Sequence, residues 1–555
     1  MNSATVQRPG AGRGVTLVMA CLGVFVAYLP VTTVSVSLPA IQRTLGASTS
    51  QLSWVSDAFV LPMAALILTT GVWGDVHGRK RVFQVGMAFC ALGAAVSLGS
   101  DSVQSLWVGQ AASGLGAAAL LPTTLALISH AVPDHRERGR FIGLWAMSML
   151  ASLAMGPLIA GVLLEHVGVR WIFLLPVPVS LVVLVVAAFL LPDSRAPHGR
   201  RLDWPGQITA AVAVTAVVYG VIEGGADGFG APHVVSALVL GAVSAVAFVL
   251  VERRSGSPML DPALFRSPAF AATSLVAMVS FLGLIGFFFV LSLYFGLVQH
   301  LTTLEAGLRM VLVSGTSLVA GIPVGRLMHR VSPRVMITTG LVVMAGSLLS
   351  LSGIDAGTSY GSLAWRLVLL GLGIGAVLTP MTASAVSSVP HHLAGMAAAG
   401  NNAFRQLGGA LGPAVLGALL TTRALGALPD RLADAGVPAE TGGHVLDVAR
   451  EQGLGAVAGL DLGAATGPAL SALGGSFLDG LRLCLIVSAS LALLAALTCA
   501  VLLRPAAPAG RPAAGRPASG APVGATAPMA RTAASATAVP AAADGASAQG
   551  LQRTP

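Results

Sequence analysis

Fourteen long apolar runs, nearly free of charged side chains, constrain this 555-residue chain more than any other feature. The runs cover residues 15–39, 52–73, 82–100, 104–130, 141–164, 171–192, 206–222, 233–251, 270–298, 305–328, 335–354, 363–388, 395–420 and 479–503. A helix needs about 20 apolar residues to cross roughly 30 Å of hydrocarbon, so fourteen such helices use about half of the chain. Only 10% of the residues are charged, against roughly 25% in soluble domains. We therefore predict an all-α polytopic membrane protein.

The basic residues, cysteines and motifs exclude several function classes. The 31 lysines and arginines occur in small groups between apolar runs, unlike a nucleic-acid-binding surface. The single lysine, Lys80, follows Arg79 where a Walker A loop needs glycine, so the chain carries no ATP-driven motor. The four cysteines lie in apolar runs without CxxC spacing, which argues against a metal site or a disulfide frame. No HExxH occurs, and no GxSxG has a strand–helix setting, so neither an enzyme nor a cofactor is expected.

The distribution of arginines predicts the orientation in the membrane. Loops on the side of the N-terminus carry groups of bases, such as Arg79 to Arg81, whereas the opposite short loops carry single bases such as Arg43 and Arg170. Positive charge is retained on the cytoplasmic side. We therefore predict a multi-pass plasma-membrane protein with both termini in the cytoplasm.

An internal repeat predicts two related halves. The segment at 156–161 (GPLIAG) recurs at 412–417 (GPAVLG), and GLG at 114–116 recurs at 371–373 with nearly the same offset. We therefore expect two six-helix halves with a substrate path between them, flanking an inserted helix pair. The predicted parts are a cytoplasmic tail at 1–14, the N-terminal half at 15–192, a linker at 193–205, the inserted pair at 206–251, a linker at 252–269 and the C-terminal half at 270–503.

Two segments are predicted to lie outside the membrane. Residues 421–478 hold most of the external carboxylates and form one long extracellular loop, partly helical. Residues 504–555 consist mainly of Ala, Pro, Gly and Ser and lack the large apolar side chains that a core requires. This second segment is predicted to be a disordered cytoplasmic tail.

The loop after the second run combines glycines and charges in a pattern typical of a conformational latch. The candidate latch residues are Gly71, Gly74, Asp75, Gly78, Arg79 and Lys80. Glycines permit a tight turn and close helix approach, and Asp75 can pair with a base in a contact that breaks when two halves rock. The alternative is a basic turn that only sets topology.

This loop resembles the signature G-x-x-x-D-x-x-G-R-K/R of the major facilitator superfamily. The chain from about residue 15 to 503 is similar to its fourteen-span drug:proton antiporter branch, because residues 34–42 resemble the end of that branch's first span and residues 406–412 resemble its thirteenth. The resemblance implies the major facilitator fold.

The fifth run also resembles a motif of antiporters in this family, at Gly156, Pro157 and Gly161. Proline removes a helical hydrogen bond and glycine allows close packing, so this helix can bend against a neighbour. Ordinary small-residue packing is the alternative. The motif departs from the family pattern at Ser152 and Ala160, where the family usually has glycine.

Two charges that are common in the family are absent. Pro30 stands where the family commonly has an aspartate in the first span, and Gln110 stands where it has an arginine in the fourth. A buried charge without its partner is costly, so the joint loss is physically consistent. If that pair normally moves protons, this protein couples through other groups or couples differently.

Asp57 and Arg405 are the ionisable residues placed deepest in the runs. An ionisable group inside a span is a functional hypothesis by default. We expect Asp57 to bind the coupling proton, the alternative being a carboxylate solvated at the outer interface. Arg405 is expected either to hold an anionic substrate group or to lock the two halves, which is a structural role.

The cavity between the halves is expected to hold mainly small, apolar and hydroxyl side chains. Its candidate polar residues are Thr32, Thr33, Gln110, Thr123, Asn401, Asn402 and Arg405. Such a lining suits a drug-sized amphipathic molecule. We therefore expect a monomeric, proton-driven exporter of an antibiotic, a dye or a natural product, working by alternating access. The alternative is a facilitator or importer without strict proton coupling, and a polytopic enzyme or receptor would need a polar cluster or ligand domain that the sequence does not show.

Overall fold

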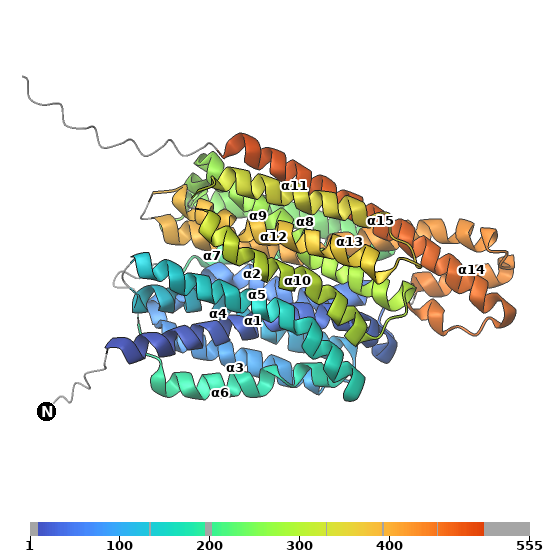
Figure 1. Cartoon of the computed structure of the whole chain (residues 1–555), viewed down its shortest axis with the longest axis horizontal. Helices are drawn as coiled ribbons and strands as arrows, with labels where there is room; N and C mark the ends of the chain where they lie inside the picture. Colours follow the sequence, from blue (N-terminus) through green and yellow to red (C-terminus); the bar gives the residue numbers. More distant parts are fainter. Residues whose placement is uncertain are drawn as a thin grey trace, which may run out of the picture. The chain divides into compact units, whose positions relative to one another are not determined.

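The computed structural model describes residues 9–132, 135–194, 202–328, 330–390, 393–451 and 453–503. Within these residues, fourteen helices are long and apolar enough to cross a membrane, and each of them covers most of one predicted run (Figure 1). The class of the protein, an all-helical multi-pass membrane protein, is therefore confirmed. The predicted tail at 504–555 lies outside the described residues.

The helices follow one another along the chain with short connections. The N-terminal half consists of α1 (Pro9–Leu45), α2 (Thr49–His77), α3 (Arg79–Leu98), α4 (Val103–Ala131), α5 (His135–His166), the short η1 (Val169–Phe173) and α6 (Pro176–Leu190). The inserted pair is α7 (Trp204–Asp227) and α8 (Pro232–Arg254). The C-terminal half consists of η2 (Pro262–Arg266), α9 (Pro268–Leu293), η3 (Tyr294–Val298), α10 (Thr303–Leu327), α11 (Pro333–Leu351), α12 (Tyr360–Ser387), α13 (Ala394–Asp434), α14 (Ala439–Glu451), η5 (Ala456–Gly459), η6 (Gly463–Ala465) and α15 (Thr466–Leu502).

Polar caps define where several of these helices begin. The side chain of Ser48 accepts a hydrogen bond from the backbone N–H of Gln51, and the side chain of Gln51 accepts one from the backbone of Ser48. The same reciprocal capping box starts α10 with Thr302 and Glu305. Both boxes satisfy N–H groups that would otherwise lack partners at a helix start.

The repeated glycines occupy equivalent contacts in the two halves. A Cβ added to Gly116 of α4 would lie 2.6 Å from the Gly86 carbonyl oxygen of α3. A Cβ added to Gly373 of α12 would lie 2.8 Å from the Gly340 carbonyl oxygen of α11. Only glycine allows either pair of helices to approach this closely. The sequence repeat therefore corresponds to a repeated helix packing.

The two halves approach each other most closely on one side of the molecule. We call this the α14 side, and we call the opposite side, where α1 begins and α15 ends, the termini side (Figure 1). On the α14 side, a Cβ added to Gly161 of α5 would lie 2.6 Å from the Leu304 Cα of α10. A Cβ added to Gly296 of η3 would lie 2.5 Å from the Pro39 Cβ of α1. Helix–helix contacts thus close the α14 side.

Helix α7 of the inserted pair packs between α2 and α13. Near the α14 side, the Trp54 indole N–H of α2 donates to Glu223 Oε1 of α7, at 2.8 Å. Near the termini side, the Gln207 amide of α7 donates to the Ala65 carbonyl of α2, also at 2.8 Å. A Cβ added to Gly225 of α7 would lie 2.5 Å from the Ala418 Cα of α13. Two polar contacts therefore attach α7 to the N-terminal half, whereas small residues let it pack closely on α13 of the C-terminal half.

The segment predicted as the loop at 421–478 is largely helical. Helix α13 continues to Asp434, α14 follows, and α15 already begins at Thr466, whereas the last predicted run starts at residue 479. The extra turns form because Leu428, Leu432 and Val445 bury their side chains there. A Cβ added to Gly453 would lie 3.0 Å from the Thr49 backbone nitrogen, so the segment also packs on the start of α2.

Candidate functional site

Asp57 is buried on the face of α2 that meets the C-terminal half. Ser53 and Val60, one turn before and after it, both contact α13: a Cβ added to Gly417 would lie 2.7 Å from Ser53 Oγ, and one added to Gly409 would lie 3.5 Å from Val60 Cγ1. Helical spacing puts Asp57 on the same face. Its side chain is fully buried, and neither carboxyl oxygen has a hydrogen-bond partner among the described residues. The alternative of a solvated interfacial carboxylate is therefore wrong for this conformation.

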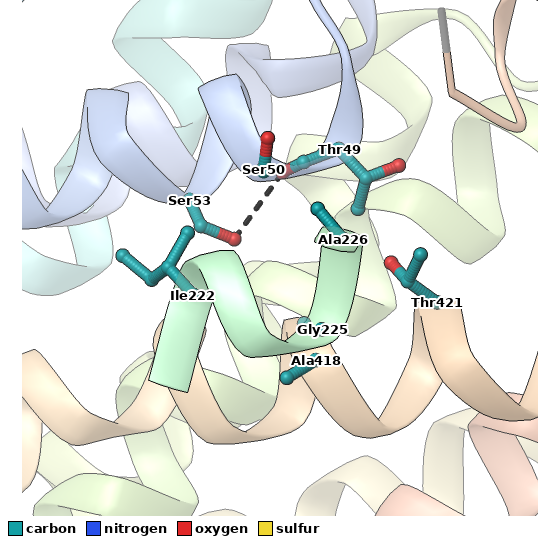
Figure 2. Close-up of a pocket in the computed structure, with 9 residues that line it drawn as sticks. Thr49, Ser50, Ser53, Ile222, Gly225, Ala226, Ala418 and Thr421 are labelled. Carbon is teal, nitrogen blue, oxygen red and sulfur yellow. Dashed lines mark hydrogen bonds between the residues drawn. The ribbon is translucent and has the colours of Figure 1, made fainter. Parts of the chain in front are cut away.

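A small pocket opens where α2, α7 and α13 meet, on the α14 side of Asp57 (Figure 2). It is lined by Thr49, Ser50, Ser53, Ile222, Gly225, Ala226, Gly417, Ala418 and Thr421. The Ser53 hydroxyl donates to the Thr49 carbonyl of its own helix at 3.2 Å, the bond drawn in Figure 2. Small side chains and hydroxyl groups thus surround the junction of the two halves and the inserted pair.

A central polar cluster joins the two halves near the middle of α1 and within the first third of α13. We define it as Tyr28, Thr382, Asn401, Asn402, Arg405 and Gln406. The Gln406 amide of α13 donates to the Tyr28 hydroxyl of α1 at 3.0 Å, and Arg405 also lies beside this hydroxyl. Arg405 donates to Thr382 Oγ1 at 2.9 Å and lies 5.0 Å from the centre of the Phe281 ring.

The central polar cluster keeps unused hydrogen-bonding capacity. Arg405 Nε, Asn401 Oδ1 and Asn402 Oδ1 are buried without partners among the described residues, although the Asn401 amide donates to the Thr273 carbonyl at 3.2 Å. A ligand that forms hydrogen bonds with such unpartnered buried donors and acceptors gains binding free energy. The cluster therefore has the chemistry of a binding site for a polar or anionic group next to an aromatic ring.

Replacing Tyr28 with phenylalanine is expected to favour the state in which the halves separate on the α14 side. The change removes the hydrogen bond to Gln406, and one such bond contributes about 1 kcal/mol, a shift of about fivefold. The measurement is the rate at which an impermeant thiol reagent labels a cysteine at Thr421, which should rise by that factor. The control is Tyr360→Phe, because Tyr360 is exposed. An unchanged labelling rate in Tyr28→Phe would contradict the role of this bond.

The candidate latch makes its contacts inside the N-terminal half. Arg79 forms an ion pair with Asp75 at 2.8 Å and donates to the Ala126 carbonyl of α4 at 3.3 Å. Lys80 Nζ donates to the Ala188 carbonyl of α6 at 2.8 Å. Gly78 ends α2 with φ 106°, which favours glycine, and the Gly71 and Gly74 positions face α4. In this conformation these latch contacts hold the N-terminal half together and do not bridge the halves.

The candidate motif of α5 packs against both α1 and α10. A Cβ added to Gly156 would collide with Thr32 Oγ1 and would lie 3.0 Å from the Thr33 backbone nitrogen of α1. The Thr33 hydroxyl donates to the Leu29 carbonyl at 2.8 Å and lies 3.5 Å from the Gly156 carbonyl. The carbonyl of the next residue, Pro157, faces Gly307 of α10. One short segment thus contacts the neighbour in its own half and the facing half.

Gln110 and Thr123 lie between helices of the N-terminal half. The Gln110 amide donates to Ser97 Oγ of α3 at 3.4 Å, and Thr123 Oγ1 lies 3.6 Å from a Cβ added to Gly74 of α2. Both residues are buried. Asn401, Asn402 and Arg405 lie close along α13, whereas Gln110 and Thr123 lie in the N-terminal half.

Sequence reasoning missed several residues of the site. Tyr28 and Gln406 connect the halves, and Ser148 and Ser152 of α5 donate to the Cys21 and Phe25 carbonyls of α1 at 2.8 Å and 2.7 Å. The spacing of the two serines, four residues apart on one helix face, was an available signal. Ser152, noted in the sequence only as a departure from the family pattern, forms one of the hydrogen bonds that join α5 to α1.

Comparisons with known proteins identify the family. The model of the Major Facilitator Superfamily matches residues 20–413. The tetracenomycin C resistance and export protein of Streptomyces glaucescens is 32% identical, over 87% of this chain and 90% of the relative. The puromycin resistance protein of Streptomyces alboniger is 34% identical, over 80% of this chain and 88% of the relative.

A solved structure shows the same fold. A bacterial homologue of the human lysosomal transporter Spinster, in an inward-facing conformation, superimposes with a TM-score of 0.58 at 16% identity, covering 88% of this chain and 98% of the other. The repeat, the packing of equivalent helices and these matches agree. The chain belongs to the Major Facilitator Superfamily.

Proposed function

We propose that this transporter exports drug-sized hydrophobic or amphipathic compounds from the cytoplasm by alternating access, driven by protons. The observation that carries the proposal is Asp57, whose carboxyl group has no partner among the described residues and is buried between the two halves. Relatives named for resistance to tetracenomycin C and puromycin support the substrate class. Antibiotics, dyes and natural products are the expected cargo.

Alternating access requires contacts on one side that break while others form on the opposite side. The halves approach each other on the α14 side through Gly161, Gly296 and Gly417, whereas the latch on the termini side contacts its own half. If the termini side is cytoplasmic, as the arginine distribution predicts, this conformation is closed toward the outside. One chain supplies both halves and the substrate path between them, so a monomer is sufficient for transport.

Asp57 is suited to link a proton to this change of conformation. A carboxylate buried without a cation or hydrogen-bond donor is costly, whereas the protonated carboxyl is neutral. When the halves part along α2 and α13 on the α14 side, water reaches Asp57 and a proton from that side can bind. Protonation therefore favours the conformation in which α2 and α13 are in contact.

Everted membrane vesicles from an efflux-deficient host test the proposal. Vesicles with the transporter should accumulate a fluorescent dye when an imposed pH gradient makes their interior acidic, and a protonophore should abolish the accumulation. Flux that ignores the pH gradient would instead support the facilitator. A growth panel of antibiotics in the same host would then identify the substrates.

Arg405 is expected to select for anionic or strongly accepting groups on the substrate. Its guanidinium lies beside Phe281 with Nε unused, and a charge-assisted hydrogen bond contributes about 1.5–3 kcal/mol. Arg405→Gln should therefore raise the KM for an acidic substrate by about tenfold or more, while a neutral analogue changes little. Equal losses for both compounds would indicate a purely structural role.

A further inference from the structure

Glu252 is a buried carboxyl group at the termini-side end of α8, away from Asp57 and the central polar cluster. Its side chain is 2% exposed. Oε2 accepts a hydrogen bond from the Leu260 backbone N–H at 3.2 Å, and the backbone of Met259 also bonds to the carboxyl group. Oε1 has no hydrogen-bond partner among the described residues. One oxygen of this carboxyl group therefore binds the linker after α8, and the other oxygen is available for a further hydrogen bond.

Asp203 presents a second buried carboxyl group to the same point. Its Oδ1 caps α7 by accepting from the Gly206 backbone N–H at 2.9 Å, while Oδ2 is buried without a partner. A Cβ added to Gly206 would lie 2.7 Å from Glu252 Oε1 and 3.1 Å from Asp203 Cγ. The two carboxyl groups thus meet at Gly206, where only a glycine leaves room for both.

In the described part of the chain, the charges that act on this pair do not compensate it. Among the described residues, the charged groups that act on Glu252 are Asp203, just before α7, and Asp261 of the linker, and both are acidic. Arg253 and Arg254 follow in the chain, but their side chains are exposed. Two adjacent buried carboxylates cannot both be ionised at low cost, and the usual solution is that they share one proton.

We infer that Asp203 and Glu252 form a second proton-binding site, in which one proton bridges Glu252 Oε1 and Asp203 Oδ2. This proton would satisfy both unpartnered oxygens with one hydrogen bond. The site lies near the aqueous surface at the ends of α7 and α8, so it exchanges protons with the termini side.

The proton would control the linker that Glu252 holds. In this linker, Met259 Sδ lies 3.7 Å from Thr69 Oγ1 of α2, and the Asp261 N–H donates to Met396 Sδ of α13 at 3.2 Å. Leu260 packs at Gly400 of α13, where an added Cβ would lie 2.6 Å from Leu260 Cδ1. The linker therefore touches both halves on the termini side. Loss of the proton would make the two carboxylates repel and would release the linker from this position.

Infrared spectroscopy of the full-length protein tests the shared proton. In an Asp57→Asn background, which removes the proposed coupling carboxyl, the spectrum at neutral pH should keep a protonated-carboxyl C=O band that disappears at alkaline pH. Adding Glu252→Gln or Asp203→Asn should remove this band. The new amide N–H donates the hydrogen bond in place of the shared proton, so the remaining carboxylate stays ionised. The matched control is Glu165→Gln, an exposed glutamate of α5, which should keep it. A spectrum without the band would overturn the inference, and so would its loss on adding sodium at constant pH, because the pair would then bind a cation.

Spin labelling tests the link to the linker. Gly256 has open space around an added Cβ, so a cysteine there fits. Cys21, which is only partly buried, is replaced so that it does not take up the label, and the other native cysteines are buried. The label should become more mobile as the pH rises in the otherwise native protein, and it should show no pH dependence with Glu252→Gln. Equal pH dependence in both proteins would contradict the coupling. Neither the infrared band nor the mobility of the label depends on transport, so a failure of this inference is distinguishable from a failure of the proposed export function.

Discussion

Asp57→Asn is expected to reduce pH-driven efflux to the level of vesicles without transporter, while the protein still folds and binds its substrate. Asparagine has nearly the same shape as a protonated aspartate, so the packing of α2 against α13 is retained. It cannot release a proton, however, and a side chain that stays neutral cannot link transport to the pH gradient. The measurement is dye accumulation in vesicles under an imposed pH gradient, with substrate binding measured separately.

The matched control for Asp57 is Asp101→Asn. Asp101 is exposed and pairs with Arg170 at the surface, and exposed ion pairs contribute about 0–1 kcal/mol. Efflux should therefore be unchanged. If Asp57→Asn retains full pH-driven efflux, Asp57 is not the proton carrier and another group must supply the coupling.

Gly156→Ala is expected to disturb both the packing of α5 on α1 and transport. The new Cβ collides with Thr32 Oγ1 and lies 3.0 Å from the Thr33 backbone nitrogen, so α1 and α5 must move apart. Overpacking of this kind costs about 1–3 kcal/mol. The melting temperature of the purified protein should fall, and the maximal rate of efflux should fall with it.

Gly143→Ala on the same helix is the control, because an added Cβ there meets nothing within 4 Å. Replacing an exposed helical glycine in this way stabilises by about 0.5–1 kcal/mol, so the melting temperature should not fall. Thr32→Ala combined with Gly156→Ala removes the colliding oxygen and should restore part of the stability. If Gly156→Ala behaves like Gly143→Ala, the close packing of α5 on α1 is not required.

The membrane class, the spans and the family were predictable because each follows from local sequence. An apolar run must be helical in hydrocarbon, since the backbone has no other partners there, and the glycine pattern of residues 71–80 repeats a known signature. The helical turns within 421–478 were harder to predict, because they form through burial of side chains such as Leu432 and Val445. Such contacts are not encoded by hydropathy.

The candidate site shows the same division between local and distant contacts. Asp57 and Arg405 stand out in the sequence because charges are rare inside apolar runs. Gln110 was expected to face the cavity, but it bonds to Ser97 of α3, because the direction of a side chain depends on how α4 is rotated among its neighbours. Tyr28 and Gln406 carry no charge and are 378 residues apart, so no local pattern indicated their bond.

The sequence by itself predicted fourteen membrane-spanning helices, two related halves and membership of a transporter family. These properties depend on the apolar runs and on the repeat, which are read along the chain. Only the tertiary structure decided that Asp57 is buried without a partner among the described residues, that the halves meet on the α14 side, and that Asp203 and Glu252 meet at Gly206. The physical reason is that burial, pairing and close approach are properties of distant segments brought together.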